Sequence, residues 1–415
     1  MSQDSAWGST ARRTQVQLRR LARVTLGKML APEQRDADDV LMPYLRAANI
    51  QPDGHLVIDE LQSMWFRPDE ASELDLRADD VVVVEGGQGG FGRAAHISSD
   101  LPRIGFQNSV NRVRPIAGVD ARYLTYALLS ARSSGYIHAY CDGASIPHLT
   151  AEKLGRLRVP VPKFAEQVAI ADFLDREMAK IDALIEKQQR MQAALEERRR
   201  TARSELVERD PDWALVPLRR LTTSIIDCPH WTPDVVDDSD YEAVRSGCIR
   251  DAEYRPDAAL LVARETFEAR RRGVPVEAGD VLFAREAPAG EACIVPGGRN
   301  LCLGQRTVLL KIDGSLIEPE LVVANIYSQR VQDHFSVQMS GSTVGNLRLP
   351  VIRGTTIAVP PKHVQDGLVA EYRRIDADTG QLVARIARFI DLACERRAAL
   401  ITAAVTGQIS VGEAA

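Results

Sequence analysis

Polar side chains recur at corresponding places in the two halves of this 415-residue sequence, beside segments patterned like strands. The first half offers Gln107, Asn108, Ser145 and His148, and the second half offers Gln305, Arg306, Thr343 and Asn346. Such groups can hydrogen-bond to base edges in the DNA major groove. Taken one by one, these residues are more simply explained as turn caps or loop contacts. Their recurrence in both halves favours binding, by two modules that read different short sequences.

A glycine-rich loop, Glu85-Gly-Gly-Gln-Gly-Gly-Phe-Gly-Arg93, superficially resembles a phosphate cradle. It lacks the Gly-Lys-Ser/Thr of a P-loop, and no helix pattern with an acidic ribose ligand follows it. We interpret it as a turn that lets the backbone, Gln88 or Arg93 approach a partner closely. The counterpart begins at Arg285, which is a candidate DNA contact like Gln88 and Arg93. It has lost the glycine run, which excludes a mechanism needing glycines in both halves.

The sequence contains no recognisable catalytic constellation. The seven histidines are scattered without a cysteine or carboxylate at metal-ligand spacing. The acidic pairs Asp79-Asp80 and Asp237-Asp238 lie in turn-like stretches and are better read as solvated charges than as acid-base dyads. A Gly-x-Ser-x-Gly elbow and the Asp/Asn-Pro-Pro-aromatic signature of amino methyltransferases are both absent. We therefore predict a non-catalytic chain that binds no metal or cofactor of its own.

Composition places the chain among ordinary proteins with sizeable cores, at 45% hydrophobic and 26% charged residues. The net charge of −5 argues weakly against nucleic acid, so a DNA-binding face would have to be a local cluster of cations. Only seven of the 52 cations are lysine, a bias that suits bidentate arginine contacts but that a GC-rich genome would also produce. Six cysteines without a CxxC pair, no secretory segment and no membrane-length apolar run predict a cytoplasmic protein.

An internal repeat runs along most of the chain. Val16-Gln-Leu-Arg-Arg-Leu21 returns as Val216-Pro-Leu-Arg-Arg-Leu221, and the strand pattern at 79–84 returns at 279–284. At an offset of 198, Phe106-Gln107 matches Gly304-Gln305, the strand at 159–162 matches 357–360, and Gln167 matches Gln365. So many polar and turn positions in one register predict a duplicated mixed α/β globule.

A long helix is expected to follow each globule. Residues 164–207 contain no glycine or proline and carry Leu174, Ile181, Leu184, Met191 and Leu195 at coiled-coil spacing. The second helix supplies the partner seam with Leu382, Ile386, Phe389 and Leu400. The predicted fold is α+β: two mixed α/β domains separated by two long antiparallel helices, with pseudo-twofold symmetry. The predicted segments are a first domain at 1–162 with a disordered leader at 1–13, a helix at 163–210, a second domain at 211–360, and a helix and tail at 361–415.

Basic residues recur near the ends of both helices. Arg198 and Arg199 of the first helix correspond to Arg396 and Arg397 of the second. Cations there complement the helix dipole, and a solvated face is the simplest reading. A protein-docking role is a secondary possibility.

The chain resembles the specificity subunit of Type I restriction-modification systems. The residues that carry the resemblance are Ser145-Ile-Pro-His-Leu149, Val159-Pro-Val-Pro162, Glu166-Gln167, Ile181-Asp182, Leu195-Glu-Glu-Arg-Arg199, Val359-Pro-Pro361, Gln365, Glu395-Arg-Arg397 and the ending Leu400-Ile-Thr-Ala-Ala-Val-Thr-Gly-Gln408. Departures are Val364 in place of the usual glutamate and Thr379-Gly380 inside the second helix, which weaken the expected symmetry of the helices.

The resemblance implies a non-catalytic subunit for defence against foreign DNA. Each globule would be a target recognition domain that reads one half of a bipartite site in double-stranded DNA. The helices would fix the spacer and dock two adenine-methylating modification subunits through Glu166, Gln167, Gln365 and the four helix arginines. S-adenosylmethionine, ATP and magnesium would belong to the modification and restriction partners.

Two rival interpretations stay open at the level of the sequence. The acidic balance would fit a duplicated protein-protein scaffold that does not read DNA. A divergent methyltransferase fragment is a third reading, which the missing signature disfavours.

Overall fold

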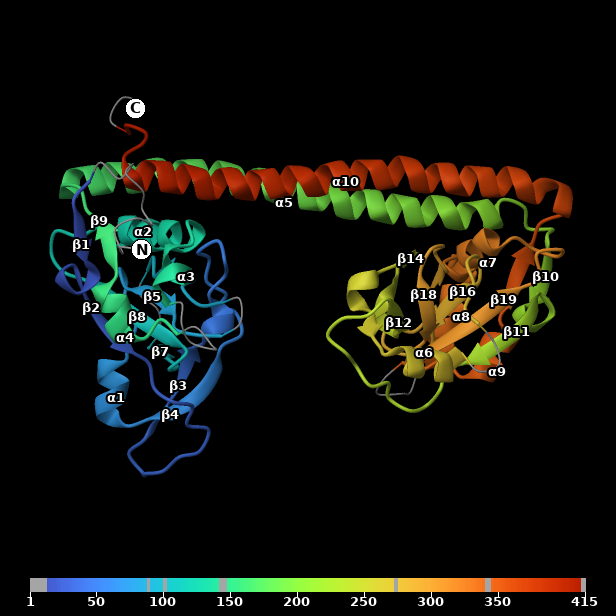
Figure 1. Ribbon diagram of the computed structural model, residues 1–415, viewed down its shortest axis with the longest axis horizontal. Coiled ribbons are helices and arrows are strands. Elements are labelled where there is room, and N and C mark those ends of the chain that lie inside the picture. Colours follow the sequence, from blue (N-terminus) through green and yellow to red (C-terminus); the bar gives the residue numbers. More distant parts are fainter. Residues whose placement is uncertain are drawn as a thin grey trace. The chain divides into compact units, whose positions relative to one another are not determined.

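The computed structural model describes residues 13–87, 90–99, 103–141, 148–271, 275–339 and 345–411. The chain divides into two units: residues 1–187 with 389–415, and residues 188–388. The leader predicted at 1–13 lies outside the described residues except for Arg13. Each unit combines one α/β globule with one half of each long helix (Figure 1).

The first unit contains nine short strands and four short helices among its described residues. The strands are β1 (Gln15–Gln17), β2 (Ala22–Leu26), β3 (Val40–Leu45), β4 (Gln62–Phe66), β5 (Val81–Val84), β6 (Ala94–His96), β7 (Gly105–Phe106), β8 (Val110–Pro115) and β9 (Arg158–Pro160). The helices are α1 (Pro68–Glu73), α2 (Ala121–Ser133), α3 (Tyr136–Cys141) and α4 (Ala151–Arg156). The main sheet is antiparallel in the order β2-β8-β5-β6, and a smaller sheet has the order β4-β3-β7.

The second unit repeats this plan. Its strands are β10 (Ala214–Pro217), β11 (Thr222–Asp227), β12 (Tyr241–Val244), β13 (Ile249–Arg250), β14 (Glu253–Tyr254), β15 (Leu260–Leu261), β16 (Val281–Ala284), β17 (Glu291–Ile294), β18 (Asn300–Leu303), β19 (Thr307–Ile312) and β20 (Thr356–Val359). Its helices are α6 (Arg264–Arg271), α7 (Pro319–Ile326), α8 (Gln329–Met339) and α9 (Leu349–Gly354). The corresponding sheets have the orders β11-β19-β16-β17 and β15-β12-β18.

The main sheet of the first unit is covered on both faces, which explains the unbroken valine run of β5. Val81 and Val83 face α2 and the long helix, whereas Val82 and Val84 pack with Phe66 and the smaller sheet. All four valines are fully buried. A strand buried on both faces is apolar at every position rather than at alternate ones.

Strand pairing corrects the predicted repeat offset at Gln305 and Arg306, which form the turn before β19. Val110 pairs with Val84 in the first unit, whereas Thr307 pairs with Ala284 in the second, so the offset is 197 here and not 198. The ion pair between Arg114 and Asp80 therefore corresponds to that between Lys311 and Asp280. Asn108 and Ser109 of the first unit consequently match Gln305 and Arg306 of the second. A uniform offset failed because the connections between strands differ in length.

The two long helices are α5 (Phe164–Glu208) and α10 (Lys362–Thr406), each of 45 residues, as the sequence predicts. Within each unit their halves run antiparallel. In the first unit Arg13 joins the start of α5 at Glu166 to the final carbonyls of α10, including that of Val405. In the second unit Arg209 pairs with Glu371 and Arg203 with Asp376.

The apolar positions predicted to form the seam fall into three groups, of which Leu195 and Leu400 are half-buried. Leu174, Ile181 and Ile386 are buried, and the first two pack on the core of the first globule. The predicted seam residues Leu184, Met191, Leu382 and Phe389 are exposed by 40% or more. Each helix half packs against a globule as well as against its partner helix, so part of the apolar spacing serves the globule and part lies on the surface.

Candidate functional site

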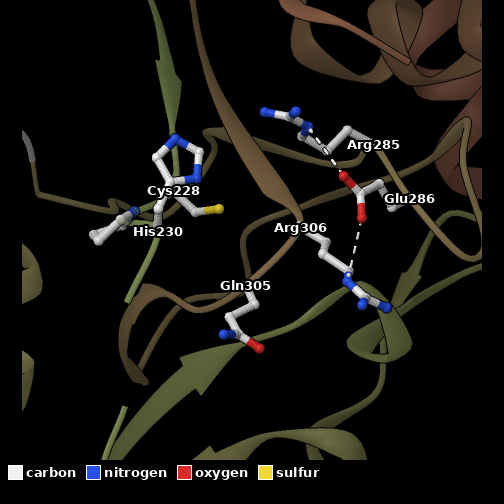
Figure 2. Close-up of a pocket in the computed structure, with 7 residues that line it drawn as sticks. Cys228, His230, Arg285, Glu286, Gln305 and Arg306 are labelled. Carbon is white, nitrogen blue, oxygen red and sulfur yellow. Dashed lines mark ion pairs between the residues drawn. The ribbon is translucent and has the colours of Figure 1, made fainter. Parts of the chain in front are cut away.

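Sheet topology gathers polar residues at one edge of the main sheet in the second unit. Because β11 and β16 both run antiparallel to β19, their carboxyl ends lie beside the amino end of β19. A pocket of about 220 Å³ opens there (Figure 2). Its lining residues are Cys228, Pro229, His230, Arg285, Glu286, Gln305 and Arg306. Three residues proposed from the sequence as DNA contacts, Arg285, Gln305 and Arg306, therefore lie together.

Two arginines at this pocket have different surroundings. Arg285 Nη1 donates to Asp227 Oδ2 at 2.6 Å, and the Arg285 side chain is 16% exposed. Arg306 places Nε 3.2 Å from Glu286 Oε2, and its side chain is 56% exposed. Glu286 also accepts a hydrogen bond from Asn346 Nδ2 at 2.8 Å on its other oxygen, Oε1. Both arginines therefore have a carboxylate partner, but Arg285 lies inside the pocket whereas Arg306 lies exposed at its rim.

Arg270, which the sequence analysis missed, holds the neighbouring loops in place. It is buried, and its Nη1 donates to the carbonyl of Leu303 at 2.7 Å while Nη2 donates to the carbonyl of Trp231. Its guanidinium lies 4.1 Å from the centroid of the half-exposed Trp231 ring. Burial lowers the pKa of Arg270. The helical spacing of residues in α6 could have predicted that this arginine faces inward. It could not have predicted the carbonyl groups to which the arginine donates.

Gln305 also has a local partner. Its Nε2 donates to Thr232 Oγ1 at 2.8 Å, so the amide is held against the loop that follows β11.

The first unit builds an equivalent edge with different residues. His148 Nδ1 lies 3.0 Å from Glu85 Oε2, and a backbone bridge joins His148 to Gly86, as Asn346 is joined to Glu286 in the second unit. Asn108 is half-buried and donates its backbone N–H to the carbonyl of Lys28 at 2.8 Å.

The remaining candidates of the first unit are less exposed than expected or outside the described residues. Gln107 is half-buried and accepts a long hydrogen bond of 3.4 Å from Ser109 Oγ. Arg93 is half-buried, with Nη1 3.4 Å from the carbonyl of Ile50. Gln88 and Ser145 lie outside the described residues, as does Thr343 of the second unit.

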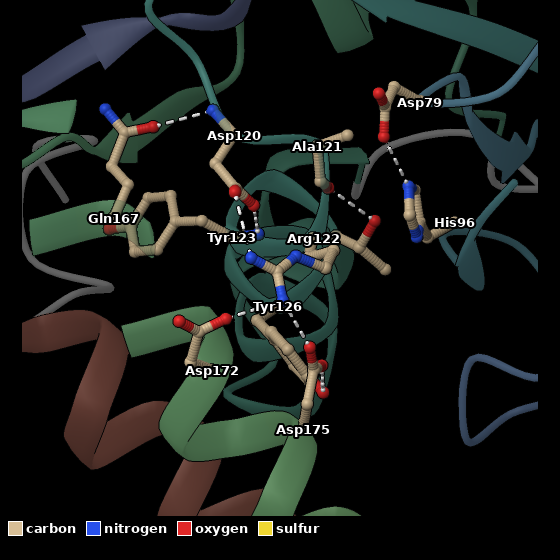
Figure 3. Close-up of polar contacts among 11 residues, drawn as sticks. Asp79, His96, Asp120, Ala121, Arg122, Tyr123, Tyr126, Gln167, Asp172 and Asp175 are labelled. Carbon is tan, nitrogen blue, oxygen red and sulfur yellow. Dashed lines mark hydrogen bonds and ion pairs between the residues drawn. The ribbon is translucent and has the colours of Figure 1, made fainter. Parts of the chain in front are cut away.

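Two glutamines proposed as docking residues are buried and hold the start of each long helix. Gln167, 2% exposed, accepts from the backbone N–H of Asp120 at 3.0 Å (Figure 3). It also donates to the carbonyl of Pro162 at 3.0 Å. Gln365, 0% exposed, accepts from the N–H of Glu318 at 3.1 Å and donates to the carbonyl of Pro360 at 2.9 Å. Direct contact between either side chain and a partner is incompatible with this burial.

The junction around Gln167 is reinforced by charged and aromatic side chains. Asp120 caps α2 by accepting from the N–H of Tyr123 at 2.9 Å. Arg122 donates to Asp172 and Asp175 of α5, both at 2.8 Å (Figure 3). These contacts fix α2 on the first turns of α5.

The helix arginines also divide into buried and exposed members. Arg199 is buried and paired with Glu253 of the second globule. Arg397 is buried and paired with Asp182, with Asp53 of the first globule 3.6 Å away. Arg198 and Arg396 are exposed, as is Glu166, which binds Arg13. Of the seven docking candidates, only these last three present side chains on the surface.

The described residues hold no group of three or more His, Cys, Asp or Glu that could bind a metal ion. Among them, no helix has the length and apolar character needed to cross a membrane.

A family model described as "Type I restriction modification DNA specificity domain" matches residues 17–193. This segment carries the features of a Type I DNA specificity domain. The resemblance noted from the sequence is thereby confirmed, and the matched region comprises the first globule with the first part of α5. No curated protein matches the sequence.

Three solved structures are similar to this chain over most of its length. A chain from a structure titled as the basis of "complex assembly and conformational transition of the type I R-M system" has 16% identity and a TM-score of 0.64, covering 95% of this chain and 98% of that one. The HsdS subunit from Thermoanaerobacter tengcongensis has 17% identity and a TM-score of 0.42, with coverages of 95% and 97%. The S subunit from M. genitalium has 13% identity and a TM-score of 0.38, with coverages of 95% and 96%. The first similarity confirms the predicted mixed helix-and-sheet fold.

Proposed function

We propose that this chain is the non-catalytic DNA-recognition subunit of a Type I restriction-modification complex, in which each globule reads one half of a bipartite target. The observation that carries the proposal is that polar residues gather at the same edge of the main sheet in both units, at the ends of corresponding strands. We call this edge the loop edge, and its polar residues differ between the two units. Phosphate contacts would position the chain on the duplex, and the loop edges would supply base contacts. Different side chains at equivalent positions suit an asymmetric target.

The long helices would set the spacer between the two half-sites. Each is a continuous helix of 45 residues, which corresponds to about 65 Å. Because a helix has a fixed rise, the number of unread base pairs would follow from its length.

The helices would also dock two modification subunits. Exposed apolar residues of α5 recur at the same positions of α10, with Leu184 matched by Leu382 and Met191 by Phe389. Glu166, Arg198 and Arg396 are exposed polar candidates on the same helices. S-adenosylmethionine for adenine methylation would be bound by those partners. ATP and magnesium would also be bound by partner subunits, and ATP would drive translocation by the restriction subunits.

The proposal is tested by selection from a random duplex library. The chain is purified with its modification subunit, bound duplexes are sequenced, and a two-part motif with constant spacing is expected. Failure to enrich any two-part motif would refute the proposal. A salt series adds a second criterion, because DNA recognition predicts affinity that falls steeply with salt, whereas a scaffold would bind duplex weakly at every salt concentration.

A further inference from the structure

We propose that Arg306 is a specificity-determining residue of the second unit and that it reads a guanine in the major groove, with Glu286 holding its guanidinium in position. This inference rests on the proposed DNA recognition. It deepens that function by naming one residue and the base it selects.

The backbone of Arg306 is fixed in an unusual conformation. Its φ is 62°, in the left-handed region that residues with a side chain rarely adopt. The carbonyl of Arg306 accepts from the N–H of Arg285 at 3.0 Å, which ties this turn to the end of β16. Backbone strain of this kind persists where the surrounding structure imposes it, and it is concentrated at functional sites. The exposed side chain therefore projects from a rigid base.

Glu286 orients the guanidinium. One carboxylate oxygen lies 3.2 Å from Arg306 Nε, and the other accepts from Asn346 Nδ2 at 2.8 Å. The hydrogen bond from Asn346 orients the Glu286 carboxylate, and the ion pair draws the guanidinium of Arg306 toward the other carboxylate oxygen. Nε forms the ion pair with Glu286, and Nη1 and Nη2 have no hydrogen-bond partner among the described residues.

The free end of the guanidinium selects guanine by its hydrogen-bonding pattern. Guanine presents two adjacent acceptors, O6 and N7, at its major-groove edge, and two terminal N–H groups can bind both. Adenine and cytosine present amino donors there, which would face the arginine donors. An arginine held by Nε therefore discriminates among bases rather than only contributing charge.

Neighbouring polar residues are committed to other contacts. Arg285 is neutralised by Asp227, and Gln305 donates to Thr232. At the position equivalent to Arg306 the first unit has Ser109, which carries no charge. The guanine contact is consequently assigned to the half-site that the second unit reads.

The test compares Arg306→Ala, Arg306→Lys and wild-type chains, each in complex with the modification subunit, by selection from the random duplex library. Wild type is expected to enrich guanine at one position that Arg306→Ala leaves undetermined, with affinity for the cognate duplex lowered about 5- to 150-fold. Arg306→Lys keeps the positive charge but lacks the two terminal N–H groups that bind O6 and N7 together. It should therefore lose the guanine preference while retaining the salt dependence of binding. Arg353→Ala is the matched control, because Arg353 is an exposed arginine at the end of α9; any loss there should be uniform across sequences.

A second measurement leaves the protein unchanged. Replacing the selected guanine by 7-deazaguanine removes the N7 acceptor, and wild type should bind this duplex about 10-fold more weakly. Arg306→Ala should bind both duplexes equally.

The outcomes separate the two proposals. A two-part motif that Arg306→Ala leaves unchanged at every position would overturn the assignment of Arg306 while supporting DNA recognition. An equal response of wild type and Arg306→Ala to 7-deazaguanine would overturn it as well. The absence of any motif in wild type would overturn DNA recognition itself, and the base assignment with it.

Discussion

Gln167 satisfies one backbone donor and one backbone acceptor where a globule meets a long helix, and Gln365 satisfies one donor and two acceptors. Both amides are enclosed, so removing either leaves buried N–H and C=O groups without partners. Such losses have a large effect on stability because water cannot replace the missing amide. These residues recur in both units for a structural reason.

Gln167→Ala and Gln365→Ala should each lower the free energy of unfolding by about 1–3 kcal/mol. Urea denaturation followed by circular dichroism measures the change. Gln189→Ala is the control, since Gln189 is an exposed residue of α5 and its loss should change stability little. Wild-type stability in both buried variants would contradict the structural role.

The ion pair between Arg203 and Asp376 occupies positions that are apolar in the first unit, where Ile401 and Met178 are found. Burial raises the pKa of Asp376, and the charge of Arg203 opposes that rise. Arg203 also donates to the carbonyl of Asp251 at 3.0 Å and lies over the ring of Tyr372. The same helix contact is therefore polar in one unit and apolar in the other.

Arg203→Ile alone should destabilise the chain by about 2 kcal/mol, because it leaves the half-buried Asp376 carboxylate without its cation. Adding Asp376→Met should recover at least half of that loss, since the pair would then match the apolar pair of the first unit. Thermal denaturation of the two single variants and the double variant gives the interaction free energy between the two positions. Additive destabilisation by the two changes would show that the pair does not act as a unit.

At the scale of the element, α10 runs without interruption through Thr379-Gly380. A Cβ at Gly380 would meet no atom within 4 Å. Tertiary packing keeps the helix intact where local propensity is weak. The departure from the family pattern at Gly380 thus costs stability without breaking the helix.

Gly380→Ala should raise the free energy of unfolding by about 0.5–1 kcal/mol, because alanine loses less backbone entropy on helix formation than glycine. Gly279→Ala is the matched control in the same unit. It also has open space around its Cβ position, but its φ of 92° disfavours a side chain, so it should destabilise the chain. Thermal denaturation measures both variants, and their melting temperatures should shift in opposite directions. A shift in the same direction would contradict this account.

At the scale of the whole molecule, each unit takes one half of α5 and one half of α10, so neither helix belongs to a single globule. Any change in the length of one helix must be matched in the other to preserve their antiparallel contacts. This dependence makes helix length a property of the assembly rather than of one domain.

Inserting one heptad after Lys187 and one after Arg388 should lengthen both helices by about 10 Å. Under the proposed function this adds about three base pairs to the spacer while leaving both half-site sequences unchanged. The library selection used above measures the spacing, and a heptad in α5 alone serves as control because it offsets the two helices. An unchanged spacer in the double insertion would refute the proposal that the helices set it.

Local patterns in the sequence determined the duplication, the two long helices and the family. These features follow from residue periodicity and motif identity, which need no knowledge of distant contacts. The valine run of β5 and the repeated turn chemistry likewise indicated where the loop edges begin.

Tertiary structure decided which member of each repeated set faces solvent. Arg199 and Arg397 are buried beside the exposed Arg198 and Arg396, and Arg306 is exposed where Arg285 is enclosed. The exposure of a side chain depends on what packs over it from elsewhere in the chain, and ion-pair partners such as Glu253 for Arg199 lie far away in sequence. Neighbouring arginines therefore look alike in the sequence and differ only once the fold brings their partners together.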